Sequence, residues 1–158
     1  MNIIFISAEV APFSKAGGLA DVSGALPQQL SSTGHNISVV SPLYSKINRE
    51  MDSIRTTGIG ALIQMGNEDV PFELYNFDHN QSDGPHQYFI HNDDLFGREG
   101  IYTLPNGEGF ADNNFRYFFF QKAIIKLIEI EFFKPDLVHC NDHHTAMLPF
   151  FIINGKME

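Results

Sequence analysis

Cysteine is almost missing from this sequence, and tryptophan is missing altogether. Cys140 is the only cysteine, so no disulfide can form within the chain, and we expect a reducing, cytoplasmic setting. No apolar run is long enough to span a bilayer. The apolar segment at residues 1–10 has no basic leader, which favours a buried first strand over a signal peptide.

Basic residues are also scarce. The chain has 10 Lys and Arg residues against 19 Asp and Glu residues, for a formal net charge of −9. A nucleic-acid-binding protein needs a basic surface that displaces counterions from phosphates, and an anionic membrane attracts the same kind of surface. We therefore expect neither nucleic acid nor a membrane as a partner. A phosphate group could bind only at a focused local site.

The order of apolar patterns predicts a single α/β domain over residues 1–158. We expect a Rossmann-like three-layer sandwich, with a mostly parallel central sheet and a β-hairpin insertion. The predicted strands are 2–7, 36–41, 58–66, 70–78, 87–91 and 137–140, and the predicted helices are 19–33, 112–133 and 144–153. Residues 92–110 are rich in Gly, Asp and Asn and predict an ordered surface loop.

A glycine-rich loop, Lys15-Ala16-Gly17-Gly18-Leu19-Ala20-Asp21, lies between the first strand and the first helix. Paired glycines let a ligand approach the backbone, and free N–H groups at a helix start favour negative charge. Lys15 adds a cation that suits a phosphate. A plain turn with a solvated Lys15 is the alternative. The spacing fits neither the dinucleotide fingerprint nor the Walker A motif, which disfavours nicotinamide enzymes and P-loop NTPases.

A longer stretch around this loop resembles a known family. Residues 14–27, together with Glu9 and Pro12, are similar to the "K-x-G-G-L-A-D-V" opening of bacterial glycogen synthases and plant starch synthases. The resemblance implies the N-terminal half of a GT-B fold, with the active site in an interdomain cleft. It implies that Lys15, Gly17 and Gly18 face the donor's diphosphate and sugar. Asp21 would lie on the glucan acceptor side. Glu9 is a further acceptor-side candidate, with a structural ion pair as its alternative.

Two further segments resemble the family in the same order. Residues 110–117 are similar to its "Y-x-D-N-x-x-R-F" helix start, where Asp112 can cap the helix and Arg116 can pair back one turn later. Residues 95–102 are similar to its loop of an aromatic followed by "D-R-x-G-x-Y". Phe96 or Tyr102 could there form a stacking platform for a sugar. The alternative is that these rings only anchor the loop.

Residues 138–146 resemble the family's "V-H-x-H-D-W-H-[TA]" segment, and Asp142 and His144 keep their places in it. A carboxylate beside an imidazole can hydrogen-bond sugar hydroxyls, which suits glucan recognition. Three alternatives stay open. His139 could be a core histidine, and Asp142 could act only as the N-cap of the last helix. The cluster of His139, Cys140, Asp142, His143 and His144 could bind a metal, although its residues point in different directions.

The resemblance implies a retaining transfer of glucose from ADP-glucose to the non-reducing 4-hydroxyl of an α-1,4-glucan such as glycogen. It implies no cofactor and no metal, and no residue here stands out as a general base. The family's second, nucleotide-sugar domain is absent from these residues, so we expect the chain alone to be inactive. The alternative is a stand-alone, non-catalytic module that binds a glucan or a nucleotide.

Overall fold

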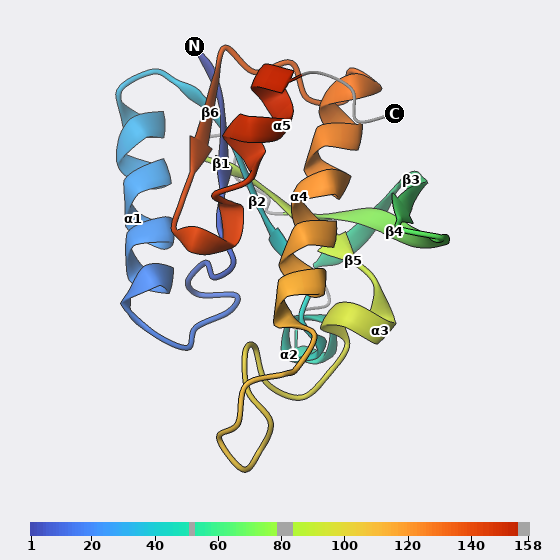
Figure 1. The fold of residues 1–158 in the computed structure, drawn as a ribbon. Coiled ribbons are helices and arrows are strands. Elements are labelled where there is room, and N and C mark those ends of the chain that lie inside the picture. The colour runs from blue at the N-terminus through green and yellow to red at the C-terminus, as the bar shows by residue number, and fades with distance from the viewer. Residues whose placement is uncertain (51–52, 79–83, 155–158) are drawn as a thin grey trace.

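The computed structural model describes residues 1–50, 53–78 and 84–154. A six-stranded sheet runs through its centre in the order β3-β4-β5-β2-β1-β6 (Figure 1). Strands β5, β2, β1 and β6 are parallel, and β3 and β4 form an antiparallel hairpin at one edge. The strands are β1 (Asn2–Ile6), β2 (Asn36–Pro42), β3 (Ile54–Met65), β4 (Glu68–Phe77), β5 (His86–His91) and β6 (Leu137–Cys140).

Helices cover both faces of this sheet. In Figure 1, α1 lies on one side, and α4 and α5 lie on the other. The helices are α1 (Gly18–Ser32), α2 (Ser45–Glu50), α3 (Asp93–Phe96), α4 (Asn113–Glu129) and α5 (Leu148–Asn154), with a 3₁₀ turn at His143–Thr145. The three layers, the mostly parallel sheet and the hairpin insertion confirm the predicted fold class.

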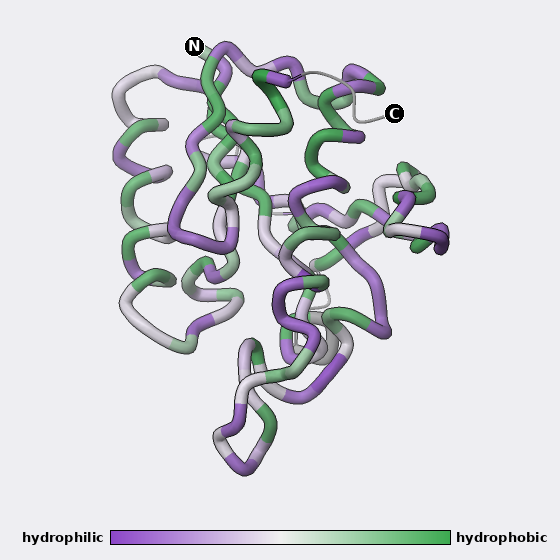
Figure 2. Tube along the Cα trace, in the orientation of Figure 1, coloured by the Kyte–Doolittle hydropathy of each residue, from purple (hydrophilic) through white to green (hydrophobic). Residues whose placement is uncertain are grey.

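Alternating residues of β1 and β2 separate the core into two parts. Ile3, Phe5, Ile37 and Val39 face α1, where Leu26 and Leu30 pack against them. Ile4, Ile6 and Val40 belong to the larger cluster on the other face, together with aromatic side chains of α4. In Figure 2 the central strands are coloured as hydrophobic, while polar colours gather in the outer loops. Both faces are buried because both carry helices.

The predicted first helix is confirmed, with two details at its proline and its end. α1 is one helix that continues through Pro27. Gly34 follows the helix with φ at +88° and donates its N–H to the carbonyl of Ser31 at 2.9 Å. A glycine accepts this left-handed conformation without strain, as expected for a helix C-terminus.

Three element boundaries differ from the predictions. β3 begins at Ile54 rather than at residue 58, and its register against β4 shifts between Thr56 and Gly60. α4 ends at Glu129, because the chain turns back through Glu131 at φ +59° and buries Phe133. The last predicted helix is a 3₁₀ turn followed by α5. The α-helix starts at Leu148 and has Pro149 in its first turn, where the missing N–H of a proline removes no helical hydrogen bond.

The 92–110 segment is an ordered loop, as predicted, and it contains the short helix α3 and a bridge between Thr103 and Gly109. Across the described ranges, no helix has both the length and the apolar character that crossing a membrane requires.

Candidate functional site

Three segments meet beyond the carboxyl end of β1, in the lower half of Figure 1. We call them the glycine loop (residues 14–21), the aromatic loop (residues 97–112) and the histidine turn (residues 141–147). The first follows β1, the second precedes α4 and the third follows β6. Because β1 and β6 are parallel neighbours, their carboxyl ends bring the glycine loop and the histidine turn together. Ligand sites of open α/β sheets form at this edge.

The glycine loop presents an open backbone. Gly17 and Gly18 are exposed, and a Cβ built on either would meet nothing within 4 Å. The amides of Gly18 and Leu19, in the first turn of α1, have no hydrogen-bond partner among the described residues. Lys15 is exposed, and its Nζ lies 2.6 Å from Oδ1 of Asp21. The loop therefore combines accessible backbone, open amides and a cation.

Glu9 occupies the inner side of the glycine loop. Its side chain is buried, with 3% of its surface exposed, and its Oε2 accepts the N–H groups of Ala16 at 2.6 Å and Gly17 at 2.9 Å. Its Oε1 accepts the hydroxyl of Tyr102 at 2.6 Å. Both oxygens are thus engaged inside the protein. The alternative for Glu9 was a structural ion pair, but its partners in the structure are two backbone amides and a hydroxyl, and none of them is a cation.

Phe96 corrects an expectation. Its ring is completely buried and packs edge-on against Tyr44, with ring centroids 5.9 Å apart, and near Phe119 and Phe120. A ring without exposed surface cannot stack on a sugar, so Phe96 belongs to the core. It reaches the core because α3 turns Leu95 and Phe96 inwards. Tyr102, the other aromatic candidate of this segment, is only partly buried.

Tyr102 forms an aromatic wall with the histidine turn. Its ring stacks on His144 with centroids 4.8 Å apart and an interplanar angle of 15°, and Tyr117 packs edge-on against His144 at 4.5 Å. This wall lines a pocket of about 530 Å³. Polar side chains share the lining with the rings, among them Asn113, Asn114, Gln121 and His143. Rings beside amides and imidazoles are suited to a sugar, which has apolar C–H faces and hydroxyl edges.

Burial sets the protonation of this wall. It lowers the pKa of His144 to about 4, with the neighbouring His143 as a second cause, so the imidazole is neutral at neutral pH. Its Nδ1 is buried without a partner among the described residues. Burial also raises the pKa of Tyr102, so its hydroxyl stays protonated and donates a hydrogen bond to Glu9. The rings of Tyr102 and His144 therefore carry no charge near pH 7.

Asp142 is exposed and adopts φ +67° at the start of the histidine turn. Its Oδ1 accepts the backbone N–H of His143 at 2.6 Å, and this hydrogen bond is the main cause of its lowered pKa. Asp142 therefore caps the 3₁₀ turn and not the last helix, for which the cap was predicted. Its ionised carboxylate faces solvent beside the pocket.

The structure brings together only part of the predicted metal-binding cluster. Donor atoms of Asp142, His143 and His144 lie within 4.8 Å of one another. His139 stacks instead on Phe5 in the sheet, with centroids 4.4 Å apart, and is only partly buried on the edge strand β6. A structural zinc site uses four protein ligands, and this set provides three, of which Asp142 already contacts the Nδ1 of His143 at 3.0 Å.

Arg116 has partners other than the one that its spacing predicts. It is completely buried and donates to the carbonyls of Leu95 at 2.6 Å and Ile101 at 2.9 Å, and to Asn113 at 2.7 Å. Asp112 pairs instead with Arg98, at 2.8 and 2.6 Å. Together these arginines hold the aromatic loop against α4. The sequence could not indicate this, because the acceptors are mainly backbone carbonyls.

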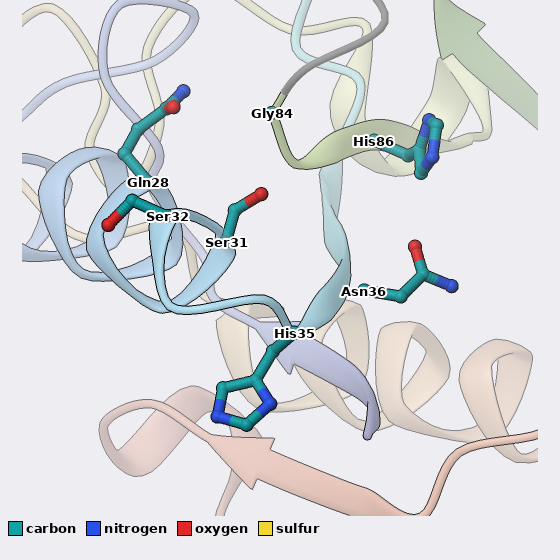
Figure 3. Close-up of a pocket in the computed structure, with 7 residues that line it drawn as sticks. All are labelled: Gln28, Ser31, Ser32, His35, Asn36, Gly84 and His86. Carbon is teal, nitrogen blue, oxygen red and sulfur yellow. The ribbon is translucent and has the colours of Figure 1, made fainter.

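A second pocket lies away from this site. Figure 3 shows it between the end of α1 and the beginnings of β2 and β5, at the opposite edge of the parallel strands. Its volume is about 410 Å³, and its lining includes Ser31, His35, Asn36 and His86. None of the candidate site residues from the sequence lines this second pocket. The sequence motifs instead come together at the site beyond β1.

Comparisons with known proteins agree on one family. The model of the starch synthase catalytic domain matches residues 2–156. The chain is 35% identical to the glycogen synthase of Geotalea daltonii, over 99% of this chain and 31% of the relative, and 36% identical to that of Aquifex aeolicus, over 96% and 31%. The solved catalytic domain of starch synthase IV from Arabidopsis thaliana, bound to ADP and acarbose, superposes with a TM-score of 0.75 at 25% identity. That match covers 93% of this chain and 29% of the other. The chain thus spans less than a third of the length of these relatives.

Proposed function

Because this chain belongs to the family of starch synthase catalytic domains, we propose that it supplies one wall of a glucosyltransferase active site. The reaction is the transfer of glucose from ADP-glucose to the 4-hydroxyl at the non-reducing end of an α-1,4-glucan, with retention of configuration. The Arabidopsis relative, bound to ADP and acarbose, supports a nucleotide and a glucan-like ligand on this fold.

The open backbone at Gly17 and Gly18 is the observation that carries the proposal. A diphosphate can approach there without meeting a side chain, next to the unpartnered amides of the first turn of α1 and the ammonium group of Lys15. In the transfer, negative charge grows on the departing nucleotide diphosphate. Oriented amides and a nearby cation stabilise that charge more strongly than water does. The glycine loop is thus the donor side.

The pocket beside the histidine turn is the acceptor side. His144 and Tyr102 offer ring surface, and Asp142 presents an ionised carboxylate that can accept hydrogen bonds from sugar hydroxyls. Asp21 stands at the beginning of α1 in contact with Lys15, and we assign it to the acceptor side of the glycine loop. We assign each of these described residues a role in positioning the ligands, and we assign none of them a role in proton transfer. We therefore expect no turnover from residues 1–158 alone.

Titration of the isotope-labelled chain with ADP tests the donor side. We expect the amide signals of residues 15–19 to shift. Lys15→Ala should weaken ADP binding about 10- to 150-fold, since a hydrogen bond to a charged group contributes about 1.5–3 kcal/mol. Gly18→Ala should weaken ADP binding without lowering the stability of the chain. The added Cβ meets no protein atom within 4 Å, but it occupies the space into which the diphosphate would bind.

Lys126→Ala is the matched control, because Lys126 is a partly exposed lysine that also has a carboxylate partner, Glu129 at 3.5 Å, but lies on α4. ADP binding should be unchanged in it. If ADP leaves the signals of the glycine loop unmoved in the wild-type chain, the proposed donor side is wrong.

A further inference from the structure

Tyr102 and Glu9 stand 93 positions apart in the sequence and share a 2.6 Å hydrogen bond. We propose that both are positioning residues. Their hydrogen bond fixes the glycine loop in the conformation that leaves the amides of Gly18 and Leu19 open to a ligand. We call this pair, with the contacts from Glu9 to Ala16 and Gly17, the Tyr102–Glu9 link. The choice of ligands in this inference rests on the proposed function, whereas the existence of the link does not.

The contacts of Glu9 form a closed local network. A single buried carboxylate receives three donors, two from the backbone of the glycine loop and one from the aromatic loop. Hydrogen bonds to an ionised group are short and about twice as strong as neutral ones. Ala16 and Gly17 are held from the inside, while the amides that follow, those of Gly18 and Leu19, have no partner among the described residues. Glu9 thus acts on a ligand through the backbone rather than by touching it.

Tyr102 is itself held in place by α4. Its carbonyl accepts the side-chain amide of Asn113 at 2.9 Å and the N–H of Phe110 at 3.0 Å. The preceding carbonyl, that of Ile101, accepts from the buried Arg116. Its ring rests on His144. The hydroxyl therefore reaches Glu9 from a rigid base, and it can fix the position of the carboxylate.

The link also joins the two sides of the site. One face of the Tyr102 ring belongs to the wall of the acceptor pocket, and its hydroxyl contacts the residue that holds the glycine loop. A ligand that presses on this ring changes the Glu9 contacts, and through them the amides of Ala16 and Gly17. Coupling of this kind is reciprocal, so each ligand changes the affinity for the other by the same factor.

Tyr102→Phe tests the link, because it removes one hydroxyl and keeps the ring that stacks on His144. We expect hydrogen exchange at the amides of Ala16 and Gly17 to become about tenfold faster or more in the ligand-free chain. Tyr75→Phe is the matched control. Tyr75 also donates to a glutamate, Glu73 at 3.2 Å, but on the exposed hairpin. That variant should leave both amides unchanged.

Glu9→Gln is the second variant. Its amide oxygen is a weaker acceptor than a carboxylate oxygen, so the hydrogen bonds from the loop amides weaken and exchange at Ala16 and Gly17 should again accelerate. If both amides exchange at the wild-type rate in Tyr102→Phe and in Glu9→Gln, the link does not hold the loop and the inference is overturned.

Ligands separate this inference from the proposed function. In the wild-type chain, maltotetraose should shift the amide signals of Ala16 and Gly17, and in Tyr102→Phe that shift should be lost while signals at His144 still move. An equal shift at the loop in both chains would overturn the coupling. If neither ADP nor maltotetraose binds the wild-type chain, the proposed function fails, and the exchange comparison still decides whether the link exists.

Discussion

Lys15 and Asp21 form an ion pair across the mouth of the glycine loop, with Nζ and Oδ1 2.6 Å apart. Both side chains are more than half exposed. The cation that suits a phosphate is therefore already engaged by a carboxylate one helical turn into α1. An incoming diphosphate has to displace Asp21 or share Lys15 with it, and the ion pair competes with the ligand.

Asp21→Asn should strengthen ADP binding. The substitution frees Lys15 and removes a negative charge that repels the diphosphate. An exposed ion pair contributes about 0.2–1 kcal/mol, so the gain in affinity should be up to about fivefold at low salt and smaller at high salt. Glu129→Gln, which frees Lys126 on α4, should have no effect. Equal or weaker ADP binding by Asp21→Asn would show that the pair does not compete with the ligand.

The buried His144 predicts an acid-sensitive stability. Its pKa is about 6.5 when unfolded and about 4 in the folded chain, where burial disfavours the charged imidazole. As the pH falls from about 6.5 to about 4, the unfolded chain takes up a proton that the folded chain does not. This residue's contribution to stability should therefore fall over that range, by up to about 3 kcal/mol, and be constant above it.

Urea unfolding at a series of pH values measures this loss. His144→Phe keeps an aromatic ring against Tyr102 and Tyr117 and cannot be protonated, so the decline should be smaller in that variant. A direct NMR titration of the imidazole gives the second check. A midpoint near 6.5 in the folded chain would contradict the burial argument.

The sequence was sufficient for most of the fold. Continuous apolar strands and a long aromatic helix predict the layers, and the glycine loop follows β1 as expected. What the sequence could not predict are contacts between distant segments. Nothing near Glu9 indicates that Tyr102 is its partner, and nothing near Arg116 indicates that its acceptors are backbone carbonyls. Such partners depend on how the aromatic loop folds back, which local patterns do not encode.

Phe96 is a residue for which the sequence predicted a ligand contact that the structure does not show. A large aromatic in a loop rich in Gly and Asp suggested a ligand platform, because loops usually lie at the surface. The single turn of α3 is enough to rotate the ring into the core, where the guanidinium of Arg116 lies 5.4 Å from its centroid. Residue type alone could not distinguish these two positions.

Substitution at Phe96 should therefore affect stability rather than glucan binding. Phe96→Ala removes a fully buried ring and should lower the free energy of unfolding by about 3–5 kcal/mol, measured by urea denaturation. Phe115→Ala, a matched change at an exposed position of α4, should cost less than about 1 kcal/mol. Phe96→Leu retains more of the apolar volume, so the chain stays folded and should bind maltotetraose as the wild type does. If Phe96→Leu keeps the wild-type free energy of unfolding but no longer binds maltotetraose, the Phe96 ring contacts the ligand. Replacing a core residue changes the free energy of unfolding, whereas replacing a surface residue that contacts a ligand does not.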